Sequence, residues 1–464
     1  MLDFATIRRA EVNYAAFHGG LDVLMERAGS VVAEEIRKTV RKGSRILFLC
    51  GSGNNGGDGI TAAGFLSGEY ETTVIIATGD GKVRTQLSAN ALEKYHGRIA
   101  PFEDVEEEVA KADYIVDALL GTGSKRSLRE PLLTAVRIMN ESGKEILSVD
   151  IPTGLGTREA VKPSVTVTFT ARKKGMTPGN SGRIRIADVG IPDDCFSNSG
   201  PGDFIFYPIP EAASHKGMNG IVSVIAGWEY FGAGVMTSLS ALRTGVDLVK
   251  VYLQKDRMIA FYGYSPELML NEFHSGSIDE INKSNCLLIG PGMGMDGSDR
   301  EAAESVIKEC RVPIVIDANT LKIIDRSLLK GKEVVVTPHH GEFEIFSGLS
   351  ATEKNARAVA RETGCVVLLK GSTDIISDGK TTFHGVGGNA RMTMGGTGDM
   401  LAGLVAGFVA RGMPLLNAAS FAAYVNKTAA ELAFVEKGYW YSAMDMMEKF
   451  PFVINDARMK AHQA

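Results

Sequence analysis

The sequence predicts a two-domain α/β protein, and three observations support this fold class. The chain has 464 residues, more than one hydrophobic core usually organises. Short β-rich runs alternate with segments long enough for crossover helices, which is typical of parallel sheets covered on both faces. The 53 glycines, in an otherwise ordinary composition, indicate many tight turns between strands and helices.

The elements of this fold can be placed from the residue pattern. In the first half, apolar residues at three- and four-residue steps predict a helix over residues 21–39. Strands follow there at residues 46–50, 73–77, 114–118 and 146–151. In the second half, strands are predicted at residues 221–225, 249–253, 286–289, 313–317, 333–337 and 365–370.

A stretch rich in Pro, Gly, Ser and Asp covers residues 191–220 and separates the two halves. We therefore expect two domains, of residues 1–208 and 209–464. The apolar run over residues 400–410 is too short for the roughly 20 residues that a bilayer requires, and it predicts a buried helix.

Composition excludes several classes of protein. The net charge of −5 gives no electrostatic reason to expect nucleic acid or an acidic membrane as a partner. The five cysteines are odd in number, widely spaced and without a CxxC motif, so they predict reduced core thiols and no zinc site. The first residues lack a long apolar targeting segment, which favours a cytoplasmic protein.

A glycine-rich loop, GSGNNGGDG over residues 51–59, directly follows the first strand and precedes a helix. Its amides and the helix N-terminus are expected to face a phosphate. Gly51, Gly53 and Gly56 satisfy the dinucleotide fingerprint, but no clear acidic residue ends the next strand. The loop also contains Asn54, Asn55, Gly57 and Asp58. These polar residues favour a ligand site over a purely structural turn.

Polar residues also follow two further strands of the first half. Asp117 precedes a GTG sequence, and Asp150 lies in DIPTG together with Thr153. Both positions are where open α/β sheets bind ligands. Asn55, Asp117 and Thr153 supply hard oxygen donors suited to an alkali or alkaline-earth cation. The alternative is that Asp117 and Thr153 only cap the turns that follow them.

The motifs MERAG, GSGNNGGDG, DALLGTG and SVDIPTG resemble the YjeF N-terminal domain, the NAD(P)H-hydrate epimerase. The resemblance spans about residues 1–208 and implies a Rossmann-like parallel sheet sandwich. It implies that potassium is bound by Asn55, Asp117 and Thr153. The substrate contacts that it implies are Asn54, Asn55, Gly56, Gly57, Asp58, Gly121, Thr122, Gly123, Ser124, Lys125, Arg126, Ser127 and Asp150.

Epimerisation at a hydroxylated ring carbon needs an acid or base beside that carbon, and Asp150 is our candidate for this catalytic role. Arg27 departs from the family pattern, because relatives usually have Asn there. We therefore do not transfer to this chain the contact that relatives make at this position, or the dimer contact near it.

The sharpest motif of the second half is MGGTGDM, residues 394–400. Gly395, Gly396 and Gly398 permit close backbone approach, and an apolar helix begins immediately afterwards. The helix amides are expected to stabilise charge on a transferring phosphoryl group. Asp399 could accept the proton of an attacking hydroxyl. The alternative is a helix N-cap, which does not explain three preceding glycines.

Three more loops fit the same site. His339, His340 and Glu342 follow one predicted strand, and Lys370 and Gly371 end another; GPGMG closes a third at residues 290–294. For the histidines we favour a hydrogen-bonded loop pair over a metal site, because no third soft ligand is visible. Taken alone, Lys370 could equally be a solvated surface charge.

The second half contains six motifs in the order FGAGVMTSLSALRTGVDLVKVYL, GPGMG, VIDANTL, TPHHGEF, LLKGSTD and GGTGDMLAG. Together they are similar to the carbohydrate-kinase-like YjeF C-terminal domain, the ADP-dependent NAD(P)H-hydrate dehydratase. The similarity covers about residues 210–464 and implies a ribokinase-like α/β/α fold. Implied contacts to the hydrated dinucleotide are Ala233, Gly294, His339 and Asp399. Implied nucleotide contacts are Lys370, Gly371, Ser372, Thr373, Asp374 and Gly398.

The implied reaction is phosphorylation of the ring hydroxyl with help from Asp399, followed by loss of phosphate, with Mg²⁺ bridging the phosphates of ADP. Two residues depart from the family pattern. His340 stands where relatives have Pro, and Trp228 replaces a small residue.

Together the two halves predict a bifunctional repair enzyme that interconverts the R and S hydrates of NAD(P)H and dehydrates the S form, yielding AMP and phosphate. We expect small-molecule substrates and a homo-oligomer. The main alternative is a ribokinase-like vitamin or sugar kinase with an N-terminal dinucleotide-binding module. A nicotinamide-dependent dehydrogenase lacks a convincing ribose-binding acid. A non-enzymatic RNA-associated scaffold is disfavoured by the acidic balance of the chain.

Overall fold

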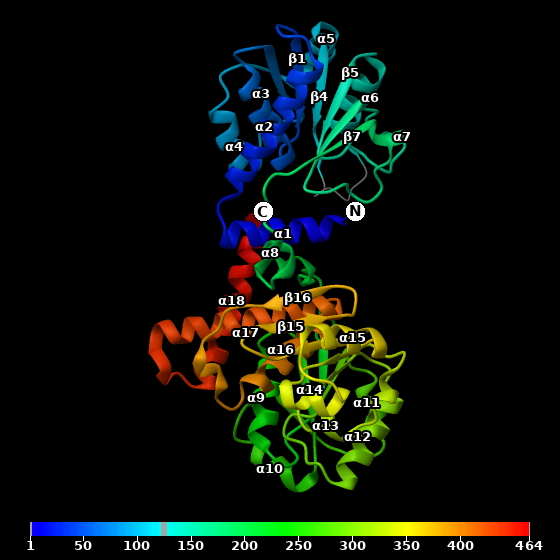
Figure 1. The fold of residues 1–464 in the computed structure, drawn as a ribbon, viewed down its shortest axis with the longest axis vertical. Coiled ribbons are helices and arrows are strands. Elements are labelled where there is room, and N and C mark those ends of the chain that lie inside the picture. Colours follow the sequence, from blue (N-terminus) through cyan, green and yellow to red (C-terminus); the bar gives the residue numbers. More distant parts are fainter. Residues whose placement is uncertain (1, 122–127, 464) are drawn as a thin grey trace. The chain divides into compact units, whose positions relative to one another are not determined.

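The computed structural model describes residues 2–121 and 128–463 (Figure 1). The chain divides into two compact units, which are described separately. Unit 1 comprises Met1–Asp193 with Gln463–Ala464, and unit 2 comprises Asp194–His462. The division precedes the functional boundary predicted at 208/209 because the 3₁₀ helix η2 (Pro201–Phe206) packs within unit 2. There Ser420 Oγ donates to Asp203 Oδ2 at 2.9 Å, and the Phe204 and Phe421 rings meet edge to face.

Unit 1 contains a seven-stranded sheet in the order β3-β2-β1-β4-β5-β6-β7, parallel throughout. Its strands are β1 (Arg45–Cys50), β2 (Glu71–Ile76), β3 (Arg98–Ala100), β4 (Tyr114–Ala118), β5 (Glu145–Val149), β6 (Val165–Phe169) and β7 (Arg183–Ala187). The chain runs outward from β1 to β3 and then returns to pair β4 with β1. This reversal creates a topological switch point, where open α/β sheets bind ligands at the strands' carboxyl ends.

Helices cover both faces of this sheet (Figure 1). The helices of unit 1 are α1 (Phe4–Phe17), α2 (Leu21–Thr39), α3 (Asn54–Leu66), α4 (Gln86–Glu93), α5 (Val105–Lys111), α6 (Leu132–Glu141) and α7 (Pro178–Ser181). Successive residues of a strand point to opposite faces. Phe48 of β1 accordingly joins the core beneath α2, α3 and α4, whereas Leu47 and Leu49 join the core beneath α5 and α6.

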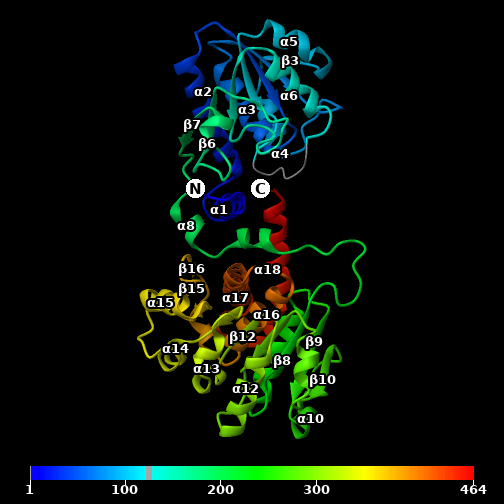
Figure 2. The same cartoon turned by 90° about the vertical axis from the view of Figure 1, so that its right-hand side faces the viewer.

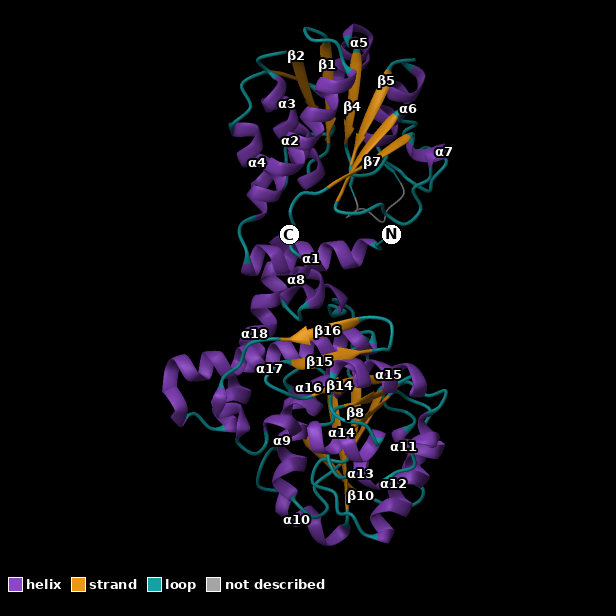
Figure 3. Cartoon of the chain, viewed as in Figure 1, coloured by secondary structure: helices purple, strands orange, loops and turns teal. Residues whose placement is uncertain are grey.

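Unit 2 contains a nine-stranded sheet in the order β10-β9-β8-β11-β12-β13-β14-β15-β16 (Figure 3). Its strands are β8 (Ile221–Ile225), β9 (Leu248–Leu253), β10 (Leu268–Glu272), β11 (Cys286–Ile289), β12 (Ile314–Ile316), β13 (Val334–Val336), β14 (Val366–Leu369), β15 (Asp374–Ser377) and β16 (Thr382–Gly385). The sheet is parallel from β10 to β14 and antiparallel from β14 to β16. The fold class predicted from the sequence is therefore confirmed.

The helices of unit 2 also form two layers (Figure 2). They are α9 (Phe231–Leu242), α10 (Met258–Phe261), α11 (Ser277–Ile281), α12 (Gly297–Glu309), α13 (Thr320–Ile323), α14 (His340–Ser347), α15 (Glu353–Thr363), α16 (Thr397–Ala410), α17 (Leu415–Lys437) and α18 (Ala443–Gln463), while the short α8 (Asp193–Ser197) begins at the division between the units. Right-handed crossovers place α9 on one face of the sheet and α12 to α15 on the other. Helix α16 packs against α9 and against β8, β11 and β12. Helix α16 is buried from Met400 to Ala410, as predicted.

None of the helices in the described ranges combines the length and the apolar character that a membrane span requires. All five cysteines are buried and carry free thiols, which agrees with the expectation of reduced core residues.

Candidate active sites

The glycine-rich loop of unit 1 lies at the switch point of its sheet. A Cβ atom at Gly51 would lie 1.9 Å from the Leu119 carbonyl oxygen, and one at Gly56 would lie 2.0 Å from the Gly51 carbonyl oxygen. The loops that follow β1 and β4 are therefore in backbone contact, which only glycine permits at these positions. Helix α3 then begins at Asn54, so its N-terminal amides lie at the predicted phosphate cradle.

The side-chain amide of Asn55 is buried in this cradle. Within residues 2–121 and 128–463, neither its Oδ1 nor its Nδ2 has a hydrogen-bond partner. A Cβ at Gly121 would lie 3.0 Å from Oδ1 of Asn55, so this amide faces the loop after β4. Because buried amides are nearly always hydrogen-bonded or coordinated, Asn55 is arranged for a ligand that approaches between the two loops.

Asp117, at the end of β4, forms a dense set of hydrogen bonds. Thr153 donates its hydroxyl to Oδ1 at 2.7 Å and its amide to Oδ2 at 2.9 Å. Ser148 donates to Oδ2 at 2.7 Å. Burial raises the pKa of Asp117 above its usual range, although these hydrogen bonds oppose the shift.

The predicted capping role of Asp117 therefore has structural support, because its Oδ1 also accepts from the Leu119 amide at 3.3 Å. The cation role has support as well. Asp117 makes no ion pair with Lys or Arg in the described part of the chain. With the unpartnered amide of Asn55 nearby, these hard oxygen atoms could hold a monovalent cation.

Asp150 lies in a cluster of charged residues that the sequence did not reveal. Its backbone has a φ of 66°, a left-handed conformation that is uncommon for Asp. Its carboxylate forms an ion pair with Lys173, which is 1% exposed and also donates to the Phe169 carbonyl at 2.8 Å. Lys173 follows β6, and no local motif distinguishes it from a surface lysine.

Two more carboxyl groups belong to this cluster. Burial raises the pKa of Glu11, on α1, to about 7, and the negative charge of Asp150 adds to the shift while Lys173 opposes it. The pKa of Asp58 is likewise raised well above its usual value, first by burial and then by Asp150 and Glu11. Such a group of carboxyl side chains around one ammonium is suited to proton transfer near neutral pH.

The remaining substrate residues predicted for unit 1 are Thr122, Gly123, Ser124, Lys125, Arg126 and Ser127, and they lie outside the described residues. Arg27, the departure from the family pattern, has a local structural partner. Its guanidinium donates to the carbonyl oxygens of Val189 and Gly190, at 3.0 and 3.2 Å. This residue therefore ties α2 to the segment that follows β7.

In unit 2, the carboxyl ends of neighbouring strands bring together one lysine and three carboxyl groups. Lys370 Nζ lies 2.8 Å from Asp317 Oδ1 and 3.9 Å from Glu342 Oε2. The Lys370 side chain is 17% exposed, so the alternative that it is a solvated surface charge is wrong. Burial opposes its charge, but Asp317 and Glu342 outweigh burial and raise the pKa of the ammonium group.

Asp399 is the third carboxyl group. Burial raises its pKa to about 6, repulsion from Asp317 and Glu342 adds to the shift, and Lys370 opposes it. The residue is not a helix N-cap, because Gly396, with a φ of 99°, occupies that position and Asp399 lies in the first turn of α16. A Cβ at Gly398 would lie 3.2 Å from Nζ of Lys370. The first turn of α16 therefore meets the lysine at the end of β14.

The two histidines have different surroundings. His339 caps α14: its Nδ1 accepts from the Glu342 amide at 3.3 Å, and its own amide donates to Glu342 Oε2 at 3.0 Å. This supports the predicted hydrogen-bonded loop role. His340 begins α14 and lies beside Gly371, where an added Cβ would be 3.5 Å from its Nε2. The departure at His340 thus adjoins the predicted nucleotide loop.

A cavity of about 780 Å³ opens beside this loop. Its lining includes six of the predicted residues, His339, Lys370, Gly371, Ser372, Asp374 and Gly398, together with Asn389, Thr397, Asn426 and Lys427. Lys427, on α17, donates to the carbonyl oxygens of Gly371 and Ser372 at 3.2 and 2.9 Å and lies 3.5 Å from Asp374. Sequence reasoning missed Asn426 and Lys427, because a polar pair inside a long helix carries no motif.

Three of the predicted dinucleotide contacts and one predicted nucleotide contact, Thr373, are absent from the lining of this cavity. Asp399, Thr373, Ala233 and Gly294 do not belong to the lining. Ala233, on α9, adjoins the loop after β11, because a Cβ at Gly292 would lie 3.1 Å from its side chain. Trp228, which departs from the family pattern, is buried and donates its Nε1 to the Tyr252 carbonyl at 3.1 Å.

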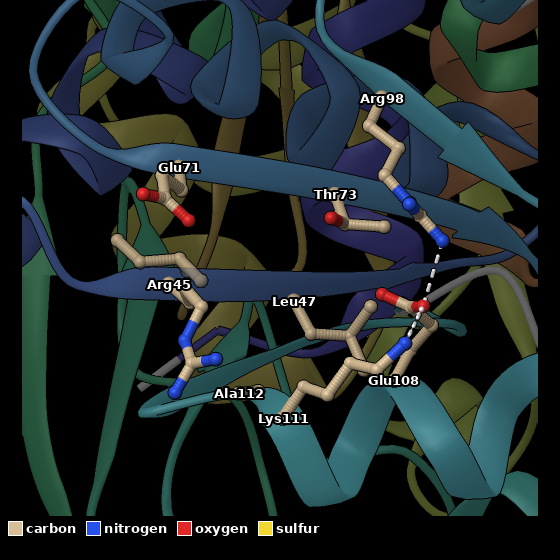
Figure 4. A pocket seen from close by; sticks show the side chains of 9 residues that line it. Arg45, Leu47, Glu71, Thr73, Arg98, Glu108, Lys111 and Ala112 are labelled. Atoms are coloured by element: carbon tan, nitrogen blue, oxygen red, sulfur yellow. Dashed lines mark hydrogen bonds and ion pairs between the residues drawn. The ribbon is translucent and has the colours of Figure 1, made fainter.

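A pocket of unit 1 lies at the end of its sheet opposite the glycine-rich loop, where β1 and β2 begin (Figure 4). It measures about 180 Å³, and its charges are largely paired: Glu108 accepts from Arg98 at 2.8 Å and lies 3.3 Å from Lys111. Because it is small, and because parallel sheets bind ligands at their carboxyl ends, this pocket is not the candidate site.

The fold and these two sites define a two-unit α/β enzyme whose C-terminal half has a carbohydrate-kinase-like architecture. The family profile described as YjeF-related protein N-terminus matches residues 21–175, and the profile described as NAD(P)H-hydrate dehydratase matches residues 222–451. The bifunctional NAD(P)H-hydrate repair enzyme Nnr of Archaeoglobus fulgidus is 35% identical, over 93% of this chain and 94% of its own length. The enzyme of that name from Pyrobaculum aerophilum is 36% identical, over 93% of each chain.

Two solved structures resemble unit 2 in fold. A ribokinase-like superfamily protein from Enterococcus faecalis gives a TM-score of 0.51 at 23% identity, covering 55% of this chain and 94% of its own. The ADP/ATP-dependent NAD(P)H-hydrate dehydratase from Bacillus subtilis, co-crystallized with ATP and Mg²⁺, gives 0.50 at 23% identity, covering 56% and 98%. Because these relatives match the chain along nearly its whole length, the chain belongs to the family of bifunctional NAD(P)H-hydrate repair enzymes.

Proposed function

We propose that this enzyme repairs hydrated NAD(P)H in two steps, each performed by one unit. Unit 1 interconverts the R and S epimers of the hydrate. Unit 2 dehydrates the S epimer at the expense of ADP and so restores NADH or NADPH. This is the function predicted from the sequence, and the relatives that match both halves of the chain carry the name of this activity.

The observation that carries the proposal for unit 2 is the position of Asp399. Its carboxyl group lies in the first turn of α16, with a pKa of about 6, beside the charge of Lys370. At neutral pH it is mostly deprotonated and can accept the proton of the substrate hydroxyl. The amides of the first turn of α16 and the ammonium of Lys370 would stabilise charge on the transferred phosphoryl group.

The chemistry balances as a transfer followed by an elimination. The hydroxyl oxygen forms a bond to the β-phosphorus of ADP while the bond to the AMP oxygen breaks, and Asp399 receives the proton. The C–O bond of the phosphorylated ring then breaks, and phosphate leaves with its electron pair. The adjacent ring carbon loses a proton to the departing phosphate, and the electrons of that C–H bond restore the ring double bond. Residues 370–374 and Gly398 would bind the nucleotide, and Mg²⁺, when bound, would neutralise charge between its phosphates.

In unit 1, Asp150 is the proposed acid or base at the hydroxylated carbon. Its ion pair with Lys173 keeps the carboxylate oriented toward the charged cluster that includes Glu11 and Asp58. Asn55, Asp117 and Thr153 would hold K⁺, a role consistent with the unpartnered amide of Asn55. The cytoplasmic location and the homo-oligomeric state remain predictions.

Product analysis tests this function directly. The purified enzyme is incubated with mixed hydrate epimers, Mg²⁺ and ADP, and the absorbance of reduced nicotinamide and the release of phosphate are followed together. We expect both to rise in equal amounts until the R and S epimers are consumed. A vitamin or sugar kinase would release a stable phosphorylated product without restoring absorbance, and that result would exclude the repair function.

A further inference from the structure

Helix α17 contributes a polar side chain to the nucleotide cavity that the proposed reaction does not yet use. Asn426 is 4% exposed and belongs to the lining of the 780 Å³ cavity. Its amide oxygen Oδ1 is buried and has no hydrogen-bond partner among the residues that the structure describes. A buried amide that is left unpaired destabilises the protein, so an amide retained at a cavity wall indicates that a ligand supplies the missing partner.

The neighbouring residue fixes the position of Asn426 relative to the predicted nucleotide loop. The Nζ atom of Lys427 donates to the carbonyl oxygens of Gly371 and Ser372, at 3.2 and 2.9 Å. It also lies 3.5 Å from the carboxylate of Asp374. The Lys427 side chain is 5% exposed, so these contacts are sheltered from solvent. The Asn426 backbone is therefore held against the loop that follows β14, on one wall of the same cavity.

The chemistry of this wall selects the kind of group that can bind. Lys370 and the first turn of α16 supply positive charge and amides, which suit phosphates. Asn426 instead offers one neutral donor and one neutral acceptor side by side. A primary amide of this kind pairs in bidentate fashion with adenine, accepting from its 6-amino group and donating to N7.

We propose that Asn426 is a specificity-determining residue that binds the adenine base of the nucleoside diphosphate donor. This inference rests on the proposed function of unit 2, and it adds a base-recognition contact to a site so far described by its phosphate and hydroxyl chemistry. A 6-oxo purine presents two acceptors along the same edge, so it leaves the amide oxygen unpaired. The site therefore discriminates ADP from IDP.

The test compares ADP with IDP as donors for dehydration of the S hydrate by the full chain. The Asn426→Leu variant keeps the side-chain volume and removes both polar groups. In the wild-type enzyme, kcat/KM for ADP is expected to exceed that for IDP by about tenfold or more, because IDP leaves a buried polar group unpaired. In Asn426→Leu the ratio is expected to fall to about one, through a higher KM for ADP with little change in kcat.

Asn417→Ala is the matched control, because Asn417 lies on the same helix and outside the cavity lining. It should retain the wild-type ratio. Calorimetric titration with ADP and with IDP in the absence of hydrate provides a readout that does not depend on turnover. Epimer exchange by unit 1 and the melting temperature of each variant report whether the protein is folded.

The outcomes separate this inference from the proposed function. If Asn426→Leu keeps the preference for ADP, or if its KM rises for the hydrate and not for ADP, the residue does not bind the donor base and the inference is wrong. If the wild-type enzyme fails to dehydrate the hydrate with any donor, the proposed function is wrong instead.

Discussion

Asp399 combines two properties that a base at neutral pH requires. It is deprotonated above pH 6, and burial with neighbouring carboxylates gives it more affinity for a proton than an ordinary Asp has. Lys370 limits the shift, because its ammonium favours the charged carboxylate. Burial and the neighbouring carboxylates raise the pKa of Asp399, and Lys370 limits the rise. This balance, and not the identity of the residue alone, makes Asp399 a suitable proton acceptor.

The pH profile of dehydration should report this pKa. Because the reaction requires deprotonated Asp399, kcat/KM is expected to be level above pH 7 and to fall about tenfold per pH unit below a midpoint near 6. The profile can be measured from pH 5 to 9 by the return of reduced-nicotinamide absorbance, with corrections for the acid lability of the substrate. A rate that stays constant down to pH 5 would rule out Asp399 as the base.

Replacement of Asp399 by Asn should separate activity from stability. The folded-state pKa of about 6 exceeds the ordinary value of 3.8, so the stabilising contribution of this group is present below pH 4 and is lost as pH rises through 6. A permanently neutral Asn avoids that loss, and the variant should be more stable by on the order of 1–3 kcal/mol at pH 8. The dehydration rate should fall by roughly 10²–10⁴-fold.

Urea unfolding at pH 8 and at pH 4.5, followed for the transition of unit 2, checks the stability of Asp399→Asn. The gain should be largest at pH 8. A variant that is destabilised at both pH values would contradict the raised pKa.

At the level of elements, the contact between the loops after β1 and β4 defines the first site. Gly51→Ala would place a methyl group 1.9 Å from the Leu119 carbonyl oxygen, so the two loops must separate. We expect a loss of epimer exchange and a melting temperature several degrees lower. Gly53→Ala is the matched control, because a Cβ there meets no atom within 4 Å. Equal melting temperatures of the two variants would show that the loops are not in contact.

The contact between α17 and the loop after β14 can be tested in the same way. Lys427→Met leaves the buried carboxylate of Asp374 without its ammonium partner, so we expect a loss of about 3 kcal/mol and a higher KM for ADP. The control is Lys437→Met, at the end of the same helix, which removes a partly exposed pair with Asp445 of α18 and should change stability by less than about 1 kcal/mol. Denaturant unfolding and donor titration measure both effects.

Buried apolar runs between turn residues were the most reliable guide to the fold. The bounds predicted for β4, β8, β11 and α2 match the structure. Helix α1 was not predicted, because its buried face includes Arg9 and Asn13 and therefore lacks a continuous apolar stripe. Strands β15 and β16 were missed because each has four residues and only the Asp-Gly sequence between them indicates a hairpin.

Prediction of the site residues from the sequence was limited in the same way. Loop residues such as Asn55, Asp150 and Lys370 could be predicted because each follows a strand, and the carboxyl ends of parallel strands meet at one edge. Lys173, Asn426 and Lys427 could not be predicted, because they reach the sites from elements distant in sequence and carry no motif. A buried ion pair or an unpartnered amide is visible only when the chain is folded.

For the whole molecule, each unit has its own sheet and its own cluster of titratable groups. Asp117 and Asp150 belong to unit 1, and Lys370 and Asp399 belong to unit 2. The central claim is therefore that one chain carries two chemically independent sites that act in sequence on one metabolite.

The most direct test of this claim measures both activities in the Asp399→Ala and Asp117→Ala variants, with mixed hydrate epimers, Mg²⁺ and ADP. We expect Asp399→Ala to abolish dehydration and to leave epimer exchange intact. Asp117→Ala should abolish epimer exchange while the S hydrate is still converted to NAD(P)H. If each variant, shown to be folded, loses both activities to the same extent, the two sites are not independent and the account is wrong.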